Sequence, residues 1–301
     1  MRQPRNITIL VLLLSALAIT PSVAQAQQAP PARVQWEELT APDFARAVEE
    51  AKSTCVLPLG ILEKHGPHLP LGTDLLNSRN LAVRAAQKEY AIVFPPFYFG
   101  QIFEAQHQPG TVAYSPRLMW DVLQETIDQI ARNGFRKILL VNGHGGNSSF
   151  LPFFCQSQLS SRKEYAVFLF QPARDTENAQ QVQKLRKTKM DQHAGEVETA
   201  TMLANRPELV RQDQANSQSG EDQQRLAGLK DLYTAIWWYA RFPDHYGGDG
   251  APATRELGEL VVKQSVDQLA AAIRAVKEDT KVLELQNQFF DGAERPLKTK
   301  Q

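Results

Sequence analysis

The chain has 301 residues, and its 33 lysines and arginines balance its 33 aspartates and glutamates. No cluster of basic residues is interleaved with aromatic ones, which argues against nucleic acid as a partner. Cys55 and Cys155 each lie in an apolar stretch. They could pair in an oxidising compartment, but two buried thiols that pack as small apolar residues are the favoured interpretation.

The first 26 residues have the pattern of a secretory signal peptide. Arg2 and Arg5 precede an apolar run of about 13 residues, and Ala24 and Ala26 form an A-x-A cleavage signal. The run is shorter than the roughly 20 residues that a transmembrane helix needs. We therefore expect a periplasmic or secreted protein without a membrane anchor. A flexible leader at residues 27–34 would precede one domain at 35–290 and a tail at 291–301.

Apolar runs of strand length alternate with helical patterns in the remaining chain. The predicted strands cover residues 53–61, 91–99, 136–143 and 165–171. Residues 77–90 and 115–134 have apolar positions three to four apart, and the second segment has Ser115 as its cap and Gly134 as its stop. Near-continuous apolar strands separated by helices predict an α/β fold, in which helices cover both faces of a parallel-rich mixed sheet.

Polar and charged segments follow the predicted strands. "EKHGPHLPLGTD" (63–74) follows the first, "GQIFEAQHQPGT" (100–111) the second and "NGHGGNSS" (142–149) the third, while "HAGEVET" (193–199) opens another helix. In open α/β sheets, ligands bind at the carboxyl ends of the strands. Five of the six histidines should therefore lie on one rim, and His245, in "FPDHYGGDG", is the exception.

The residue types on this rim indicate a metal site. Glu63 and His65 are two apart in an extended segment, so both side chains leave the same face. Asp74 returns after a loop stiffened by proline and glycine, and His144 arrives on a glycine-rich turn. Carboxylates combined with imidazoles suit zinc, manganese or iron better than a metal that prefers thiolates.

Three of these segments, "EKHGPHLPLGTD", "NGHGGN" and "HAGEVET", resemble the signature segments of the creatininase (creatinine amidohydrolase) superfamily. "EAQHQPGT" (104–111) and "GGDGAPATRELG" (247–258) are similar to two further segments of that family. The resemblance implies a three-layer α/β/α sandwich and a homo-oligomer, with a hexamer as the family form. It also implies an amidohydrolase that cleaves non-peptide C–N bonds, cyclic amides or formamides, through a hydroxide that bridges two divalent metal ions.

Carried over by position, the resemblance assigns Glu63, Asp74 and His144 to one metal ion. It assigns His65 to the other ion, with Asp74 shared as the bridge. The family's histidine on the "HA" segment corresponds to His193, which the resemblance makes the group that protonates the leaving nitrogen. The alternative for His193 is that it only orients a metal ligand.

The chain departs from creatininase after His144. A glutamate that completes the second ion in creatininase corresponds to Gly146, and the aromatic residue before it corresponds to Gly145. The missing carboxylate must come from elsewhere, and we expect Glu198 to supply it. Glu196 is the alternative ligand and the next candidate for a proton-transfer role.

Five further residues are expected near the site or beside it without a ligand role. His68 is either a partner of a ligand or a substrate contact, and His107 would line the substrate pocket. Asn147 would tie the glycine-rich turn to the backbone. One of the adjacent Trp237 and Trp238 is expected in the core and the other at the pocket or an interface.

The substrate is less well defined by the sequence. Creatininase covers creatinine with tryptophans between the "GH" and "HA" segments, and this chain has none between Trp120 and Trp237. This difference, together with the expected export, argues against creatinine. Two other classes stay open. A metal-dependent phosphoesterase would need basic residues for phosphate, and the motif loops offer only Lys64. A catalytically silent periplasmic binding protein would have lost a ligand or the acid.

Overall fold

The computed structural model describes residues 33–172 and 175–300. The expected signal peptide and residues 27–32 of the expected leader lie outside this part. Val34, at the end of that leader, is buried, and its carbonyl accepts the N–H of Val93. It therefore belongs to the folded domain. In the part described, none of the helices combines the length and the hydropathy needed to cross a membrane.

Four parallel strands form the central sheet in the order β2-β1-β3-β4. They are β1 (Thr54–Leu59), β2 (Ile92–Val93), β3 (Lys137–Asn142) and β4 (Ala166–Phe170). Each lies within a predicted strand. The second is much shorter than predicted, because it runs into two consecutive prolines, which have no N–H to donate to a neighbouring strand.

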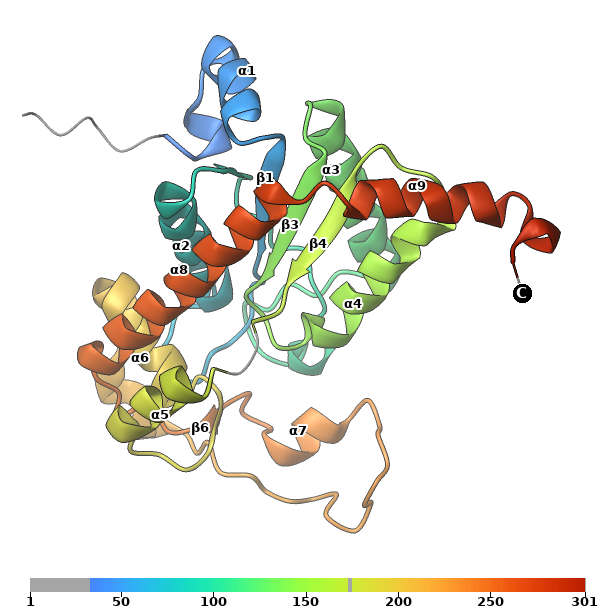
Figure 1. Cartoon of the computed structure of the whole chain (residues 1–301). Helices are drawn as coiled ribbons and strands as arrows, with labels where there is room; N and C mark the ends of the chain where they lie inside the picture. The colour runs from blue at the N-terminus through green and yellow to red at the C-terminus, as the bar shows by residue number, and fades with distance from the viewer. Residues whose placement is uncertain (1–32, 173–174, 301) are drawn as a thin grey trace, which may run out of the picture. The chain divides into compact units, whose positions relative to one another are not determined.

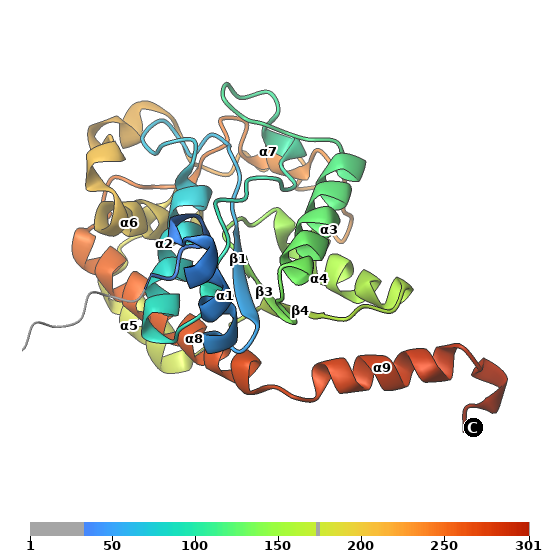
Figure 2. The ribbon, with the colours of Figure 1, turned by 90° about the horizontal axis from the view of Figure 1, so that it is seen from above.

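One face of the sheet packs against α1 (Ala41–Glu50), α3 (Pro116–Arg132) and α4 (Asn147–Ser157). Alternate strand residues such as Leu57 and Leu140 point to this side and contact Leu123 of α3 in one buried cluster. Ser115 caps α3 as predicted, since its hydroxyl accepts the N–H of Leu118. Figure 2 shows α3 and α4 on this side of the strands.

The other face packs against α2 (Thr73–Lys88) and α8 (Arg255–Glu278). Val56 and Leu139, the neighbours of the residues that face α3, contact Val266 and Ile273 of α8 in a second buried cluster. In Figure 1 both helices lie on one side of β1 and β3. Two helical layers around a mostly parallel sheet confirm the predicted α/β/α fold.

The remaining elements lie around this sandwich. They are α5 (Thr176–Leu185), the antiparallel pair β5 (Asp191–His193) and β6 (Gly247–Gly248), α6 (Glu196–Asn205), α7 (Trp237–Arg241) and α9 (Val282–Ala293). Close packing of α6 on α8 requires Gly258, because a Cβ there would lie 1.8 Å from the carbonyl oxygen of Ala200. Since α9 ends at Ala293, the domain boundary expected at residue 290 falls inside a helix.

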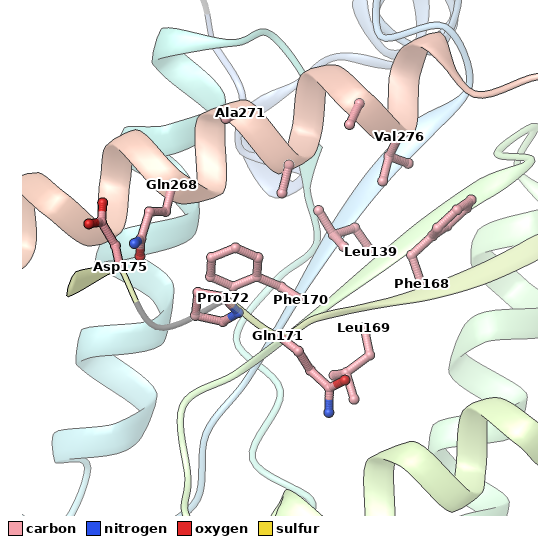
Figure 3. Close-up of a pocket in the computed structure, with 12 residues that line it drawn as sticks. Leu139, Phe168, Leu169, Phe170, Gln171, Pro172, Asp175, Gln268, Ala271 and Val276 are labelled. Carbon is pink, nitrogen blue, oxygen red and sulfur yellow. The ribbon is translucent and has the colours of Figure 1, made fainter. Parts of the chain in front are cut away.

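An apolar groove of about 530 Å³ lies between β4 and α8. Figure 3 shows Leu139 and Phe170 of the sheet facing Ala271 and Val276 of α8 across it. Its lining contains no histidine, and it shares no residue with the predicted metal site.

Both cysteines are free thiols, consistent with the favoured interpretation. Cys55 lies in β1 and is fully buried, and Cys155 lies in α4 and is partly buried. Burial raises the pKa of both thiols, to about 11 for Cys155, so neither is a reactive thiolate near neutral pH.

Candidate metal centre

A pocket of about 310 Å³ gathers side chains from loops at the carboxyl ends of β1 and β3, from β5 and α6, and from α7. In Figure 1, α7 lies beyond the ends of these strands. Seven of the residues singled out in the sequence line it: Glu63, Asp74, His144, Gly145, Gly146, His193 and Glu198.

Three donor atoms converge on one side of the pocket. His144 Nδ1 lies 2.9 Å from Glu63 Oε1 and 2.9 Å from Asp74 Oδ2. The other ring nitrogen of His144 donates to the carbonyl of Gln101 at 2.7 Å, so in a neutral ring Nδ1 carries a lone pair. Both carboxylate oxygens are buried and have no hydrogen-bond partner. Two unpartnered oxygens beside an imidazole lone pair fit a bound cation.

The second oxygen of Asp74 faces a different imidazole. Asp74 Oδ1 lies 3.1 Å from His65 Nε2, and His65 Nδ1 donates to the carbonyl of Glu63 at 3.2 Å. The ring of His65 is thereby held with Nε2 towards the carboxylate, which is the arrangement typical of histidine ligands. Because each oxygen of Asp74 faces a different histidine, its position fits a carboxylate that bridges two metal ions.

His193 and Glu198 complete the group around His65. Donor atoms of these three residues lie within 4.8 Å of one another. His193 Nε2 donates to the carbonyl of Lys64 at 2.8 Å, which leaves Nδ1 free, 3.9 Å from Glu198 Oε2. Glu198 also accepts the N–H of Ala194. Burial, reinforced by the charges of Asp74 and Glu63, raises the pKa of Glu198 to about 7.

Buried charges of both signs set the protonation of this cluster. Burial opposes ionisation of Glu63, but His144 and His193 hold its pKa well below the usual range. Burial also opposes a charge on His65 and His144, yet Asp74 raises the pKa of His65 to about 10, and Glu63 with Asp74 raises that of His144. For His193 burial prevails and lowers the pKa to about 3. A cation among the carboxylates would take over the role of these protons.

Glu196 is not brought to the pocket. Its carboxylate is buried and accepts backbone N–H groups of Lys187 and Thr188 at 2.7–2.9 Å. These bonds fix the segment before β5 against the start of α6. The catalytic role expected for Glu196 is therefore corrected to a structural one, because both of its oxygens are engaged away from the donor atoms.

The other predicted residues support the loops. His68 is buried, bonds the hydroxyl of Thr199 at 2.8 Å and contacts the ring of Tyr246, so it joins the 63–74 loop to α6 and does not reach the pocket. His107 is exposed and donates to the carbonyl of Pro243 at 2.8 Å. It lines an adjoining cavity of about 540 Å³.

Gly145 and Gly146 form the turn after His144, and the side chain of Asn147 holds this turn in place. Asn147 accepts the N–H of Gln101 and donates to Asn142. A Cβ at Gly146 would lie 2.5 Å from His144 Nε2 and 2.9 Å from the carbonyl oxygen of Gln101, whereas a Cβ at Gly145 would meet nothing within 4 Å. A glutamate at position 146 therefore does not fit this turn.

Sequence reasoning missed His245. Its Nε2 donates to Glu63 Oε2, and its Nδ1 accepts the indole N–H of Trp238 at 2.9 Å. Trp237 and Trp238 both line the pocket and are half-buried, so the expectation that one of them lies in the core was wrong. The one usable signal was that His245 stands two residues before the start of the glycine-rich segment at 247–258.

Comparisons with known proteins agree with this geometry. The family model of creatininase, described as creatinine amidohydrolase, matches residues 37–273. The creatinine amidohydrolase of Pseudomonas putida is 28% identical over 260 residues, which cover 79% of this chain and 95% of that protein. The 3-dehydro-scyllo-inosose hydrolase of Thermotoga maritima is 26% identical over 274 residues, which cover 82% and 85%.

The fold agrees as well. A solved structure of a creatinine amidohydrolase (creatininase) superposes with a TM-score of 0.68 at 25% identity and covers 82% of this chain and 99% of that one. The family model spans most of the folded part of the chain, including every loop that contributes a donor atom to the pocket. The chain therefore belongs to the creatininase family of hydrolases.

Proposed function

We propose that this protein is a metal-dependent amidohydrolase that holds two divalent ions and cleaves the C–N bond of a small amide. One observation carries the proposal. Asp74 directs one unpartnered oxygen at His144 and Glu63, and its other oxygen at His65. A single carboxylate between two separate donor groups is the arrangement that a dinuclear hydrolase needs.

The two ions would have different ligand sets. Glu63, Asp74 and His144 would hold the first ion, and His65, Asp74 and Glu198 the second. Imidazole nitrogens and carboxylate oxygens suit zinc, manganese or iron. When bound, the ions would supply an activated water as nucleophile and positive charge for the developing oxyanion.

His193 would carry the proton that the leaving nitrogen needs. Its Nε2 is committed to the carbonyl of Lys64, so the free lone pair on Nδ1 can take up a proton beside Glu198 and deliver it to the departing amine. An amide nitrogen leaves poorly as an anion, which makes this transfer a necessary part of the reaction.

The pocket favours a small substrate without negative charge. Among the residues that the structure describes, no lysine or arginine lines it, whereas Glu104 and two tryptophans do. Trp237 and Trp238 reach the site from α7, a different place in the chain from the tryptophans of creatininase. Because the tryptophans that cover the pocket come from a different part of the chain, we expect the substrate to be a small amide other than creatinine. The two relatives named above, a creatinine and an inosose hydrolase, also differ in substrate.

The same observations weigh against the rival functions. A phosphoesterase would place basic side chains around the phosphate, and the described lining has none. A silent binding protein would lack a ligand or the proton carrier, and the closeness of donor atoms from Glu63, Asp74 and His144, and from His65, His193 and Glu198, supports the enzyme instead.

The proposal is tested by metal analysis followed by a substrate screen. The mature protein, supplied with zinc, manganese or iron, should bind close to two ions per chain. It should then release amine from at least one of three substrate classes: lactams, cyclic ureas and formamides. Failure to bind any ion would overturn the proposal. Hydrolysis of phosphate esters with no amide cleavage would favour the phosphoesterase.

Two glutamates on α6 form a matched pair for testing the second ion. Glu198→Gln should weaken binding of one ion, because it removes the carboxylate charge beside His65. Glu196→Gln should leave both ions bound and lower the melting temperature, because an amide accepts the N–H groups of Lys187 and Thr188 less well than a carboxylate. Metal titration and thermal unfolding of both variants check this. The reverse pattern would mean that Glu196 is the ligand.

We also propose that the protein self-associates, as hexameric relatives in the family would imply. The segment around α7 exposes apolar side chains, with Leu232 69% and Tyr233 84% exposed. Exposed apolar side chains that gather into a patch often mark an interface. Light scattering at micromolar concentration should give a mass several times that of one chain, and a clean monomer would contradict the proposal.

A further inference from the structure

We infer that His245 and Trp238 form a hydrogen-bonded chain that positions the carboxylate of Glu63. The inference rests on the proposed function, because it treats Glu63 as a metal ligand. The indole N–H of Trp238 donates to His245 Nδ1 at 2.9 Å, and His245 Nε2 lies against Glu63 Oε2 at hydrogen-bonding distance. All three groups line the same pocket.

The indole determines the protonation of the ring. An indole nitrogen can only donate, so His245 Nδ1 must accept and cannot carry a proton. The single proton of the neutral imidazole is then on Nε2, from which it is donated to Glu63. His245 therefore has no lone pair left for a metal ion, although one of its ring nitrogens lies within 4.8 Å of donor atoms of Glu63 and His193. It is a positioning residue.

The bond from His245 Nε2 gives the two oxygens of Glu63 different roles. Oε2 is held by His245, and Oε1 stays unpartnered, 2.9 Å from His144 Nδ1. The terminal torsion of a glutamate is broad, so the carboxylate would otherwise rotate and present either oxygen, or both. With Oε2 held, Glu63 offers one oxygen to the ion beside His144.

The backbone around His245 supports this placement. His245 has φ +51°, in the left-handed region that residues other than glycine seldom adopt, and its side chain is almost fully buried. Its carbonyl accepts the N–H of Gly66, and its own N–H donates to the carbonyl of Phe242. Backbone conformations of this kind persist where the surroundings hold them, and they are frequent at functional sites. Here the conformation brings the ring against a loop 182 residues earlier in the chain.

The hydrogen bonds from Trp238 through His245 to Glu63 also connect α7, which covers the pocket, to the metal centre. Trp238 belongs to α7, which places Trp237 on the same pocket. A movement of α7 would break the indole bond and remove one of the two side-chain hydrogen bonds that hold the His245 ring in place. Side chains that hold a ligand in this way commonly contribute 10- to 100-fold to metal affinity.

The test measures metal affinity, and needs no substrate. His245→Asn removes the ring and keeps a residue type that tolerates a positive φ. Trp238→Phe keeps an aromatic ring and removes only the donor. Trp237→Phe is the matched control, because no hydrogen bond from its indole to the metal centre is present. Competition with a chelator gives the dissociation constant of each ion, and thermal unfolding reports whether each variant folds.

We expect His245→Asn to weaken one ion by about 10- to 100-fold. Trp238→Phe should weaken the same ion by a smaller factor, and the double variant should be no weaker than His245→Asn alone, since both act through one chain. Trp237→Phe should leave both constants unchanged. In ¹⁵N NMR of the wild type, the proton of His245 should be on Nε2, and in Trp238→Phe the Nδ1 resonance should shift because this nitrogen loses the indole donor.

The contrary results are distinct. Wild-type affinity in folded Trp238→Phe and His245→Asn overturns the positioning role and leaves the proposed function standing. Wild-type protein that binds no ion overturns both. If His245→Asn fails to fold, Trp238→Phe alone decides: an unchanged metal affinity and an unchanged Nδ1 resonance of His245 contradict the inference.

Discussion

Replacing Asp74 with alanine should remove both metal ions and abolish amide hydrolysis. The reason is geometric, since one oxygen of Asp74 faces His144 and Glu63 and the other faces His65. Loss of a ligand that serves only one site would leave the other ion bound. The fold should survive, because only one of the two oxygens that the substitution removes, Oδ1 beside His65 Nε2, has a hydrogen-bond partner. Metal content after gel filtration and turnover on the best substrate of the screen are the measurements.

Asp43→Ala is the matched control for this variant. Asp43 and Asp74 both lie in the first turn of a helix, α1 and α2 respectively, where a carboxylate interacts favourably with the helix dipole. Asp43 is partly exposed and far from the pocket lining. The Asp43→Ala variant should have a less stable α1 and an unchanged metal content. Retention of one ion by Asp74→Ala would show that Asp74 does not bridge, and retention of both would remove it from the ligand set.

Replacing His193 should separate proton transfer from metal binding. His193→Asn and His193→Gln should keep both ions, while turnover of an unactivated amide falls by the roughly 10² to 10⁴ that acid–base catalysis supplies. Glutamine can keep the bond to the Lys64 carbonyl, because its amide nitrogen reaches about as far as Nε2, so a loss in this variant reflects the missing Nδ1. Steady-state kinetics and metal analysis on the same preparations are the measurements.

A series of leaving groups provides the internal control. An anilide or ester with an electron-poor leaving group departs with little protonation, so both variants should recover much of their deficit on it. If the variants lose metal, the free Nδ1 of His193 is a ligand of the ion at His65 and Glu198. Full activity on an unactivated amide would place the proton carrier at another residue.

The fold was predictable because its signals are local. Apolar runs marked the strands, and a serine followed by proline marked the start of α3. The length of β2 was overestimated, because Phe97 and Phe99 extend the apolar pattern beyond two prolines that interrupt the ladder, which returns only as an isolated bridge between Phe97 and Leu59. An apolar pattern reports burial, whereas a strand also needs N–H groups to donate.

The site was predictable only where a motif names its residues. Glu63, Asp74 and His144 stand in the motif segments, and the structure places their donor atoms together. The sequence could not distinguish the two glutamates of α6, because they differ only in the direction in which their side chains point. Glu196 points towards the backbone of Lys187, and Glu198 towards the pocket. For His245 the limit was distance along the chain, since no local pattern shows that it meets Glu63.

The unpartnered oxygens of Glu63 and Asp74 also make the folding stability of this protein depend on the metal ions around it. Each buried acceptor without a partner costs about 1–3 kcal/mol, so without ions the native state bears a penalty that the unfolded chain does not. Ions that bind only the folded form offset it by mass action. Each tenfold rise in free ion above the dissociation constant adds about 1.4 kcal/mol per site. With that linkage, the lifetime of the protein would depend on the concentration of free ions in its compartment. At a low ion concentration the protein would unfold more often and be degraded by proteases.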